Sequence, residues 1–232
     1  MTPRPLARTR QAALLTVGLL ALLGCNPMQA LYFLQPWDPQ VAAPCPSLKG
    51  KRVVVLTYAA PGTQNDFTAL DREVNTRLVK ILRENVKKID VVNPEKVAAW
   101  VQAHPSSTDQ DDAAKAFEAD VAIMMEIRKF EVDNPSSPGL FEGKASVHIR
   151  VTELAHPKDS RGRPLEDKPK ESEVLFEDDC EVTFPVTGSI PVSAEVSRPV
   201  FKNRFLDVVA TNLSWRFVSH APGDDIQDTK FR

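Results

Sequence analysis

The first half of the chain alternates between short apolar runs and segments with hydrophobic positions at helical spacing. Lys51 to Tyr58 (KRVVVLTY) contains a continuous β-branched, apolar run, as strands buried on both faces do. From Asp66 to Lys87 apolar residues recur every three or four positions, with Asn65 or Asp66 as a candidate N-cap. The same patterns predict four further elements: a strand at 89–92, a helix at 94–104, a short helix at 113–117 and a strand at 121–130.

The second half changes to a period of two. Apolar residues from Phe141 to Val151 alternate with polar ones, which predicts a long half-exposed strand that follows its predecessor through a hairpin loop. A further strand is predicted at 174–184, where Asp178 is the one polar residue on the apolar face, and a final helix at 199–217. Together these elements predict an α/β (α+β) fold, a mixed sheet of about five strands with helices packed on it.

Residues 1–24 have the two regions of a secretory signal peptide. Arg4, Arg8 and Arg10 precede an unbroken small and apolar run from Ala12 to Leu23. A transmembrane helix is the weaker interpretation, because a span needs about twenty apolar residues and this run ends sooner.

The end of that run, Leu22-Leu23-Gly24-Cys25, resembles the lipobox of bacterial lipoproteins. The resemblance implies that Cys25 receives a diacylglyceryl group and becomes the first residue of the mature protein. The alternative is an ordinary secretory signal that leaves a free cysteine. Two or three acyl chains, at roughly 0.8 kcal/mol per buried methylene, anchor a protein permanently. Asn26 is not the aspartate that usually retains lipoproteins on the inner membrane, so we expect the periplasmic face of the outer membrane, with the inner membrane as the alternative.

Composition along the chain predicts the domain boundaries. Residues 25–49 are rich in proline and predict a lipidated tether, residues 50–220 a single α/β domain, and residues 221–232 a flexible tail. The tether also holds an apolar cluster from Leu31 to Leu34 with Trp37, which is unusual for a linker. Docking on the domain, contact with the membrane surface and packing in an oligomer are all open for this cluster.

Cys45 and Cys180 are an even pair of thiols in the oxidising compartment that a lipoprotein signal implies. A disulfide between them is therefore a candidate, and it would stabilise the fold by about 4 kcal/mol through chain entropy. The alternative is a buried, free Cys180 that behaves as a small hydrophobic residue. Neither cysteine has a neighbouring histidine or a Cys-x-x-Cys spacing, which argues against metal or redox chemistry.

No catalytic or cofactor motif occurs in the sequence: the nucleophile elbow, the P-loop, G-x-G-x-x-G and H-E-x-x-H are all absent. We therefore predict a protein that is not an enzyme and has no cofactor or metal. The acidic run at 177–181 is a candidate for a divalent cation, yet alternation sends Asp178 to the other face and favours a solvated strand face. The formal net charge of -2 gives no attraction to nucleic acid. No metal-ligand spacing occurs among the histidines, His104, His148, His156 and His220.

The order of elements resembles that of a known group of envelope proteins. Over Lys51 to Leu154, the strands KRVVVLTY, VAIMMEIRKF and SVHIRVTEL and the alanine-rich segment from Ala113 to Asp120 carry this resemblance. They are similar to the periplasmic α/β domain of curli-secretion-channel lipoproteins and of lipoproteins that activate peptidoglycan synthases. The resemblance implies assembly and protein contact, and not the channel itself, because the loops lack the extended alternating strands that the spanning hairpins of a secretion pore need.

We therefore expect a non-enzymatic, membrane-anchored lipoprotein that acts as an envelope assembly or accessory factor. Its expected partners are envelope proteins or further copies of itself. A binding module for a small envelope ligand, a lipid or a glycan, is the second hypothesis, and an enzyme of unrecognised type is the third. A deep apolar pocket would favour the second, and a cleft with convergent titratable groups the third.

Overall fold

The computed structural model describes residues 40–225, except residues 105–109, 135, 158, 160, 162, 164, 166, 168–169, 187 and 194–195. The predicted signal peptide, the predicted lipidation residue Cys25 and the apolar cluster at 31–37 lie outside the described residues. None of the described helices is long and apolar enough to cross a membrane.

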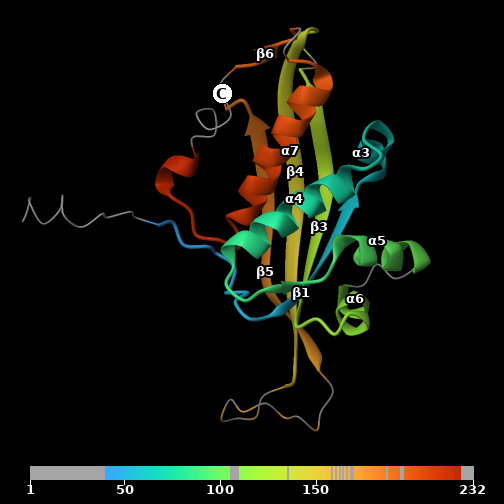
Figure 1. Cartoon of the computed structure of the whole chain (residues 1–232), viewed down its shortest axis with the longest axis vertical. Coiled ribbons are helices and arrows are strands. Elements are labelled where there is room, and N and C mark those ends of the chain that lie inside the picture. Colours follow the sequence, from blue (N-terminus) through green and yellow to red (C-terminus); the bar gives the residue numbers. More distant parts are fainter. Residues whose placement is uncertain are drawn as a thin grey trace, which may run out of the picture. The chain divides into compact units, whose positions relative to one another are not determined.

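The described chain folds into one sheet and a set of helices (Figure 1). In chain order the elements are β1 (Arg52–Ala59), α3 (Pro61–Asp66), α4 (Leu70–Asn85), β2 (Asp90–Val91), α5 (Pro94–Ala103), α6 (Gln110–Ala116), β3 (Val121–Asp133), β4 (Leu140–Ala155), β5 (Glu171–Phe184), β6 (Ile190–Pro191), α7 (Arg198–Ser214) and the 3-10 helix η1 (Pro222–Asp225).

The sheet is mixed, as predicted. Its strands lie in the order β2-β1-β3-β4-β5, and β6 pairs with the start of β4. β1 is parallel to β2 and β3, whereas the β3–β4 and β4–β5 pairs are antiparallel. The wholly apolar sequence runs lie in the parallel part and the alternating runs in the antiparallel part, because only the parallel strands are covered on both faces. The α/β fold predicted from the sequence is confirmed.

Helices cover the two faces of the sheet unequally. α4 and α7 pack side by side on one face, over a core that extends from Val53 in β1 to Phe184 in β5 (Figure 1). α5 and α6 pack on the other face, over a smaller core around Val54, Leu56 and Leu154. In the strand order β2-β1-β3, the connection from β1 to β2 and the connection from β2 to β3 run in opposite directions across the sheet. Because both crossovers are right-handed, α4 and α5 lie on opposite faces.

The helix predicted from Asp66 begins later than expected. α4 starts at Leu70 after its N-cap residue Ala69, so the predicted caps before it do not cap this helix. Pro61 starts a separate short helix, α3, because proline suits the first turn of a helix. Between the two helices, Phe67 is buried and its ring meets that of Phe130 edge-on, with centroids 5.1 Å apart. Helical spacing alone does not reveal this break.

Residues 40–49, which composition assigns to the tether, pack on the domain. Val41 and His220 exchange backbone hydrogen bonds of 2.8 and 3.1 Å, and the Cys45 N–H donates to the Arg216 carbonyl at 3.0 Å. Cys45 and Leu48 are buried in the larger core. The packed domain therefore includes residues before 50, because single apolar residues between prolines become buried without any periodicity that a sequence pattern shows.

Gly143 allows α7 to approach the sheet closely. It lies in the inner row of β4, and a Cβ atom placed on it would lie 2.6 Å from the ring of Phe205 in α7. Phe205 is fully buried, and its ring also packs near those of Phe130 and Phe201, with centroids 5.0 and 6.4 Å away. The Phe205 ring therefore fills the space that a side chain at position 143 would need.

The substitution Gly143→Ala should lower the free energy of unfolding by about 1–3 kcal/mol, because the added methyl group overpacks this contact. Urea denaturation followed by circular dichroism measures the change. Gly62→Ala in α3 is the matched control, since an added Cβ there meets nothing within 4 Å, and it should not destabilise. Equal stability of Gly143→Ala and the wild type would show that α7 does not depend on this close approach.

Candidate functional site

The outer face of β3, β4 and β5 has no described helix over most of its length. α6 reaches this region only at its end, near Leu154. In Figure 1 α4 and α7 lie in front of the sheet, and this outer face lies behind it. We call the uncovered surface the open sheet face and define it by these residues: Glu126, Arg128, Ser146, His148, Arg150, Glu177, Asp179 and Glu181.

Opposite charges pair across the strands of the open sheet face. The strand register places Glu126, His148 and Asp179 in one row. His148 Nδ1 lies 2.8 Å from Asp179 Oδ1, and His148 Nε2 lies 3.2 Å from Glu177 Oε1. Arg128 donates to Asp179 at 3.0 Å and to Glu126 at 3.1 Å. These side chains bond one another, so the face offers a polar, hydrogen-bonding surface.

The acidic run at 177–181 is divided between the two faces of β5, as alternation predicts. Glu177 and Asp179 contact His148 on the open sheet face. Asp178 lies on the other face, where its Oδ2 pairs with Arg216 Nε at 3.0 Å. Within the described ranges, no group of three His, Cys, Asp or Glu side chains is placed to hold a metal ion.

β5 forms an edge of the sheet beside the open sheet face. All of its 14 residues except Leu175 pair with β4, and within the described chain no strand pairs with its other side. A free edge presents unpaired backbone N–H and C=O groups, which an extended segment of another chain can pair with. The strand is strongly acidic, with carboxylates at Glu171, Glu173, Glu177, Asp178, Asp179 and Glu181.

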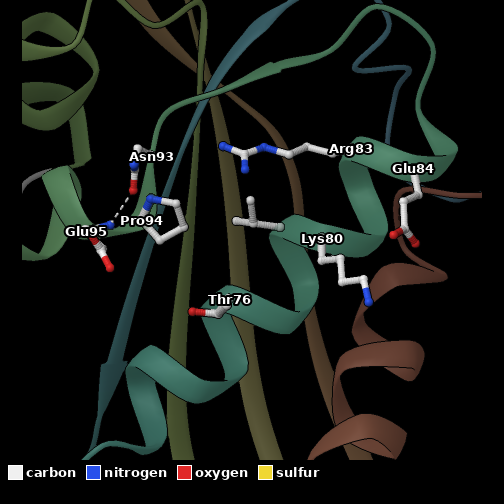
Figure 2. Close-up of a pocket in the computed structure, with 8 residues that line it drawn as sticks. Thr76, Lys80, Arg83, Glu84, Asn93, Pro94 and Glu95 are labelled. Carbon is white, nitrogen blue, oxygen red and sulfur yellow. Dashed lines mark hydrogen bonds between the residues drawn. The ribbon is translucent and has the colours of Figure 1, made fainter.

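A surface groove lies between α4 and the connection from β2 to α5 (Figure 2). Its volume is about 480 Å³, and it is lined by Lys80, Arg83 and Glu84 of α4 and by Asn93 and Glu95. In Figure 2 the Arg83 side chain extends from α4 toward Asn93. Asn93 Oδ1 accepts a hydrogen bond of 2.9 Å from the Glu95 N–H and so caps α5. Arg83 donates to a backbone carbonyl of β2 at 2.8 Å. Cations and carboxylates share the groove, so it does not select a ligand of one charge.

His148 lies in β4, whereas His104, His156 and His220 follow α5, β4 and α7. His104 stacks on Trp100 with ring centroids 4.8 Å apart, and His220 stacks on Trp215 at 4.6 Å. His148 lies on the open sheet face, where the sequence pattern placed it. The pattern did not reveal its two carboxylate partners, because they depend on the register between β4 and β5.

Cys45 and Cys180 are both free and buried, so the candidate disulfide is not formed in this structure. Burial raises the pKa of the Cys45 thiol to about 11, although the nearby Lys51 ammonium offsets part of the rise. Burial also raises the pKa of Cys180, again against the effect of a cation, Arg216. Both cysteines pack as small apolar residues of the larger core.

No family model matches this chain, and no curated protein sequence matches it. Among solved structures it is similar to the PelC dodecamer from Paraburkholderia phytofirmans, at 11% identity over 77% of this chain and 95% of that one, with a TM-score of 0.41. It is also similar to lipoprotein GNA1162 from Neisseria meningitidis, at 10% identity over 73% and 99%, with a TM-score of 0.39. The hypothetical protein CT253 from Chlamydia trachomatis has 15% identity over 58% and 72%, with a TM-score of 0.33. Likenesses this distant assign neither a family nor a function, and the resemblance to the curli-secretion-channel and synthase-activator lipoproteins stays a prediction.

Native Cys45 should resist iodoacetamide at pH 8, because a thiol with a pKa near 11 is ionised in only about one molecule in a thousand. Cys180 should resist as well, because burial raises its pKa and shields the thiol from the reagent. In denaturant without reductant both should react, and the mass of the alkylated protein counts the labels. Two blocked thiols after denaturation would show instead that the protein made in cells carries the disulfide.

Proposed function

We propose that this protein is a non-enzymatic, lipid-anchored component of the cell envelope that contacts other envelope proteins from the periplasmic face of the outer membrane. The observation that carries this proposal is the open sheet face with the adjoining free edge of β5. The proposed lipidation of the protein at Cys25 rests on the sequence, since that residue lies outside the described ranges.

The length of the antiparallel strands supports a contact role for this surface. β4 has 16 residues and β5 has 14, whereas strands of roughly five or six residues are typical. The extra length builds a broad surface that α5 and α6 do not cover. Its side chains are polar, and all of those that define it except Arg150 pair among themselves, which favours a face that can remain in contact with water.

The charge of β5 favours a different protein over a second copy of this chain. Two copies that joined their β5 edges would bring carboxylates close to carboxylates, and like charges in opposed strands are destabilising. A segment with basic side chains would instead meet opposite charge at residues 171–173 and 177–181 of the strand. We therefore expect a partner that presents an extended or exposed basic segment.

Lipidation at Cys25 can be tested directly. Cells grown with labelled palmitate should label the wild-type protein and the Cys45→Ala control, but not Cys25→Ala. The mature N-terminus, read by mass spectrometry, should be an acylated Cys25. Asn26→Asp should move the protein from the outer-membrane to the inner-membrane fraction. Label that persists in Cys25→Ala would refute the proposed anchor.

Site-specific photo-crosslinking tests the contact surface. A photoreactive residue at Ser146 or Glu181, in the lipidated protein in its own membranes, should give the same discrete adduct with one envelope protein. Lys87, an exposed residue after α4, is the control position and should not give that adduct. Glu177→Lys, which replaces an exposed carboxylate by a cation and so repels a basic segment, should remove the adduct without loss of the folded circular dichroism signal. The same adduct from Lys87, or none from Ser146 and Glu181, would contradict the proposal.

A further inference from the structure

A small crevice lies between α4 and α5, next to β1. Its volume is about 100 Å³. Thr57 near the end of β1 and Asn75 of α4 line one side, and Val97, Ala98 and Val101 of α5 line the other. It is separate from the open sheet face, which belongs to β3, β4 and β5.

The crevice lies where the order of the parallel strands reverses. From β1 the chain passes to α4 on one face of the sheet, and from β2 it passes to α5 on the other. Because the connections after β1 and β2 leave the sheet on opposite faces, a gap opens at the carboxyl ends of these two strands. Open α/β sheets bind ligands at such a position. In the described chain β2 pairs only with Arg52 and Val53. The rest of β1 has no neighbouring strand on that side.

The Asn75 side chain supplies a hydrogen bond that a neighbouring strand would otherwise give to this unpaired part of β1. Its Nδ2 donates to the Val55 carbonyl at 3.0 Å, and the residue is only 7% exposed. Its Oδ1 is buried and has no hydrogen-bond partner. Because Nδ2 is held by the backbone of β1, the orientation of the amide is fixed, and Oδ1 is a pure acceptor.

Thr57 Oγ1 is a second buried oxygen without a partner at the same crevice. Buried polar atoms are nearly always hydrogen-bonded, because an unpaired one has lost its solvation without compensation. Two such oxygens on one side of a crevice therefore point to a molecule that supplies the missing hydrogen bonds.

The walls and the size of the crevice define the chemistry of that molecule. α5 contributes an apolar side, while Asp71 and Arg72 of α4 add charged groups. Hydroxyl groups can satisfy both Asn75 Oδ1 and Thr57 Oγ1. The volume of about 100 Å³ is well below the roughly 300–1,000 Å³ of pockets for larger ligands. The crevice therefore has room for only a small polar molecule or for one edge of a larger one.

We propose that this crevice binds a small polyhydroxylated molecule, such as the terminal sugar unit of an envelope glycan, through hydroxyl groups that bond Asn75 Oδ1 and Thr57 Oγ1. The open sheet face takes no part in this binding. Failure of this proposal therefore leaves the proposed protein-contact function untouched.

Saturation-transfer NMR on the lipidated protein in detergent micelles tests the proposal, with glucose and N-acetylglucosamine as the probes. At least one sugar should give a saturable signal. Thr57→Val keeps the shape of the side chain and removes Oγ1, and it should weaken binding roughly tenfold, the effect of one lost hydrogen bond to a buried group. The fold should tolerate this change, because the hydroxyl has no partner in the free protein.

A second pair of variants separates the crevice from the rest of α5. Ala98→Leu narrows the crevice and should abolish the signal, whereas Ala99→Leu, an exposed neighbour on the same helix, should keep wild-type affinity. Thermal melts of each variant show that the fold is intact. The proposal would be overturned if neither sugar gave a saturable signal. It would also be overturned if Thr57→Val and Ala98→Leu both bound the sugar with wild-type affinity.

Discussion

Parallel strands cannot be joined by a tight turn, so each parallel connection in this sheet carries at least one helix, whereas an antiparallel connection needs only a loop. β1, β2 and β3 are linked through α4 and then through α5 and α6, which cover both faces around β1. From β3 to β5 the strands run antiparallel, and no described helix lies between them in the chain. α7 returns afterwards and covers one face only. The open sheet face follows from this topology.

The same distinction explains how much of the fold the sequence could predict. The continuous run in β1 and the alternation in β4 correctly identified a strand buried on both faces and a strand buried on one. Hydrophobic spacing could not show that Phe67 belongs to the connection before α4, because the residue faces the same core as the helix that follows it. It also missed the burial of Leu48, which depends on a tertiary contact and has no periodic neighbours.

Asp178 shows a further limit of sequence patterns. Alternation places this carboxylate on the core side of β5, and the pattern marks it as an exception. The structure supplies its partner, Arg216, which lies just after α7 and pairs with it at 3.0 Å. The Arg216 carbonyl also accepts the hydrogen bond from the Cys45 N–H. One residue thus joins β5, the end of α7 and the segment at 40–49, and no local pattern identifies a partner so distant in sequence.

The sheet has two incompletely paired strands, and they are completed in different ways. Beyond Val53, β1 is closed by a buried side chain, since the Asn75 amide donates to the Val55 carbonyl in place of a neighbouring strand. That side chain occupies the place of a strand, and the remaining Asn75 oxygen opens only on a crevice of about 100 Å³. The outer side of β5 is instead protected by carboxylates, which repel a second acidic edge but leave the backbone groups open to a basic segment. In the two proposed roles, the way each strand is completed therefore sets the size of its partner: a small molecule at β1 and a protein segment at β5.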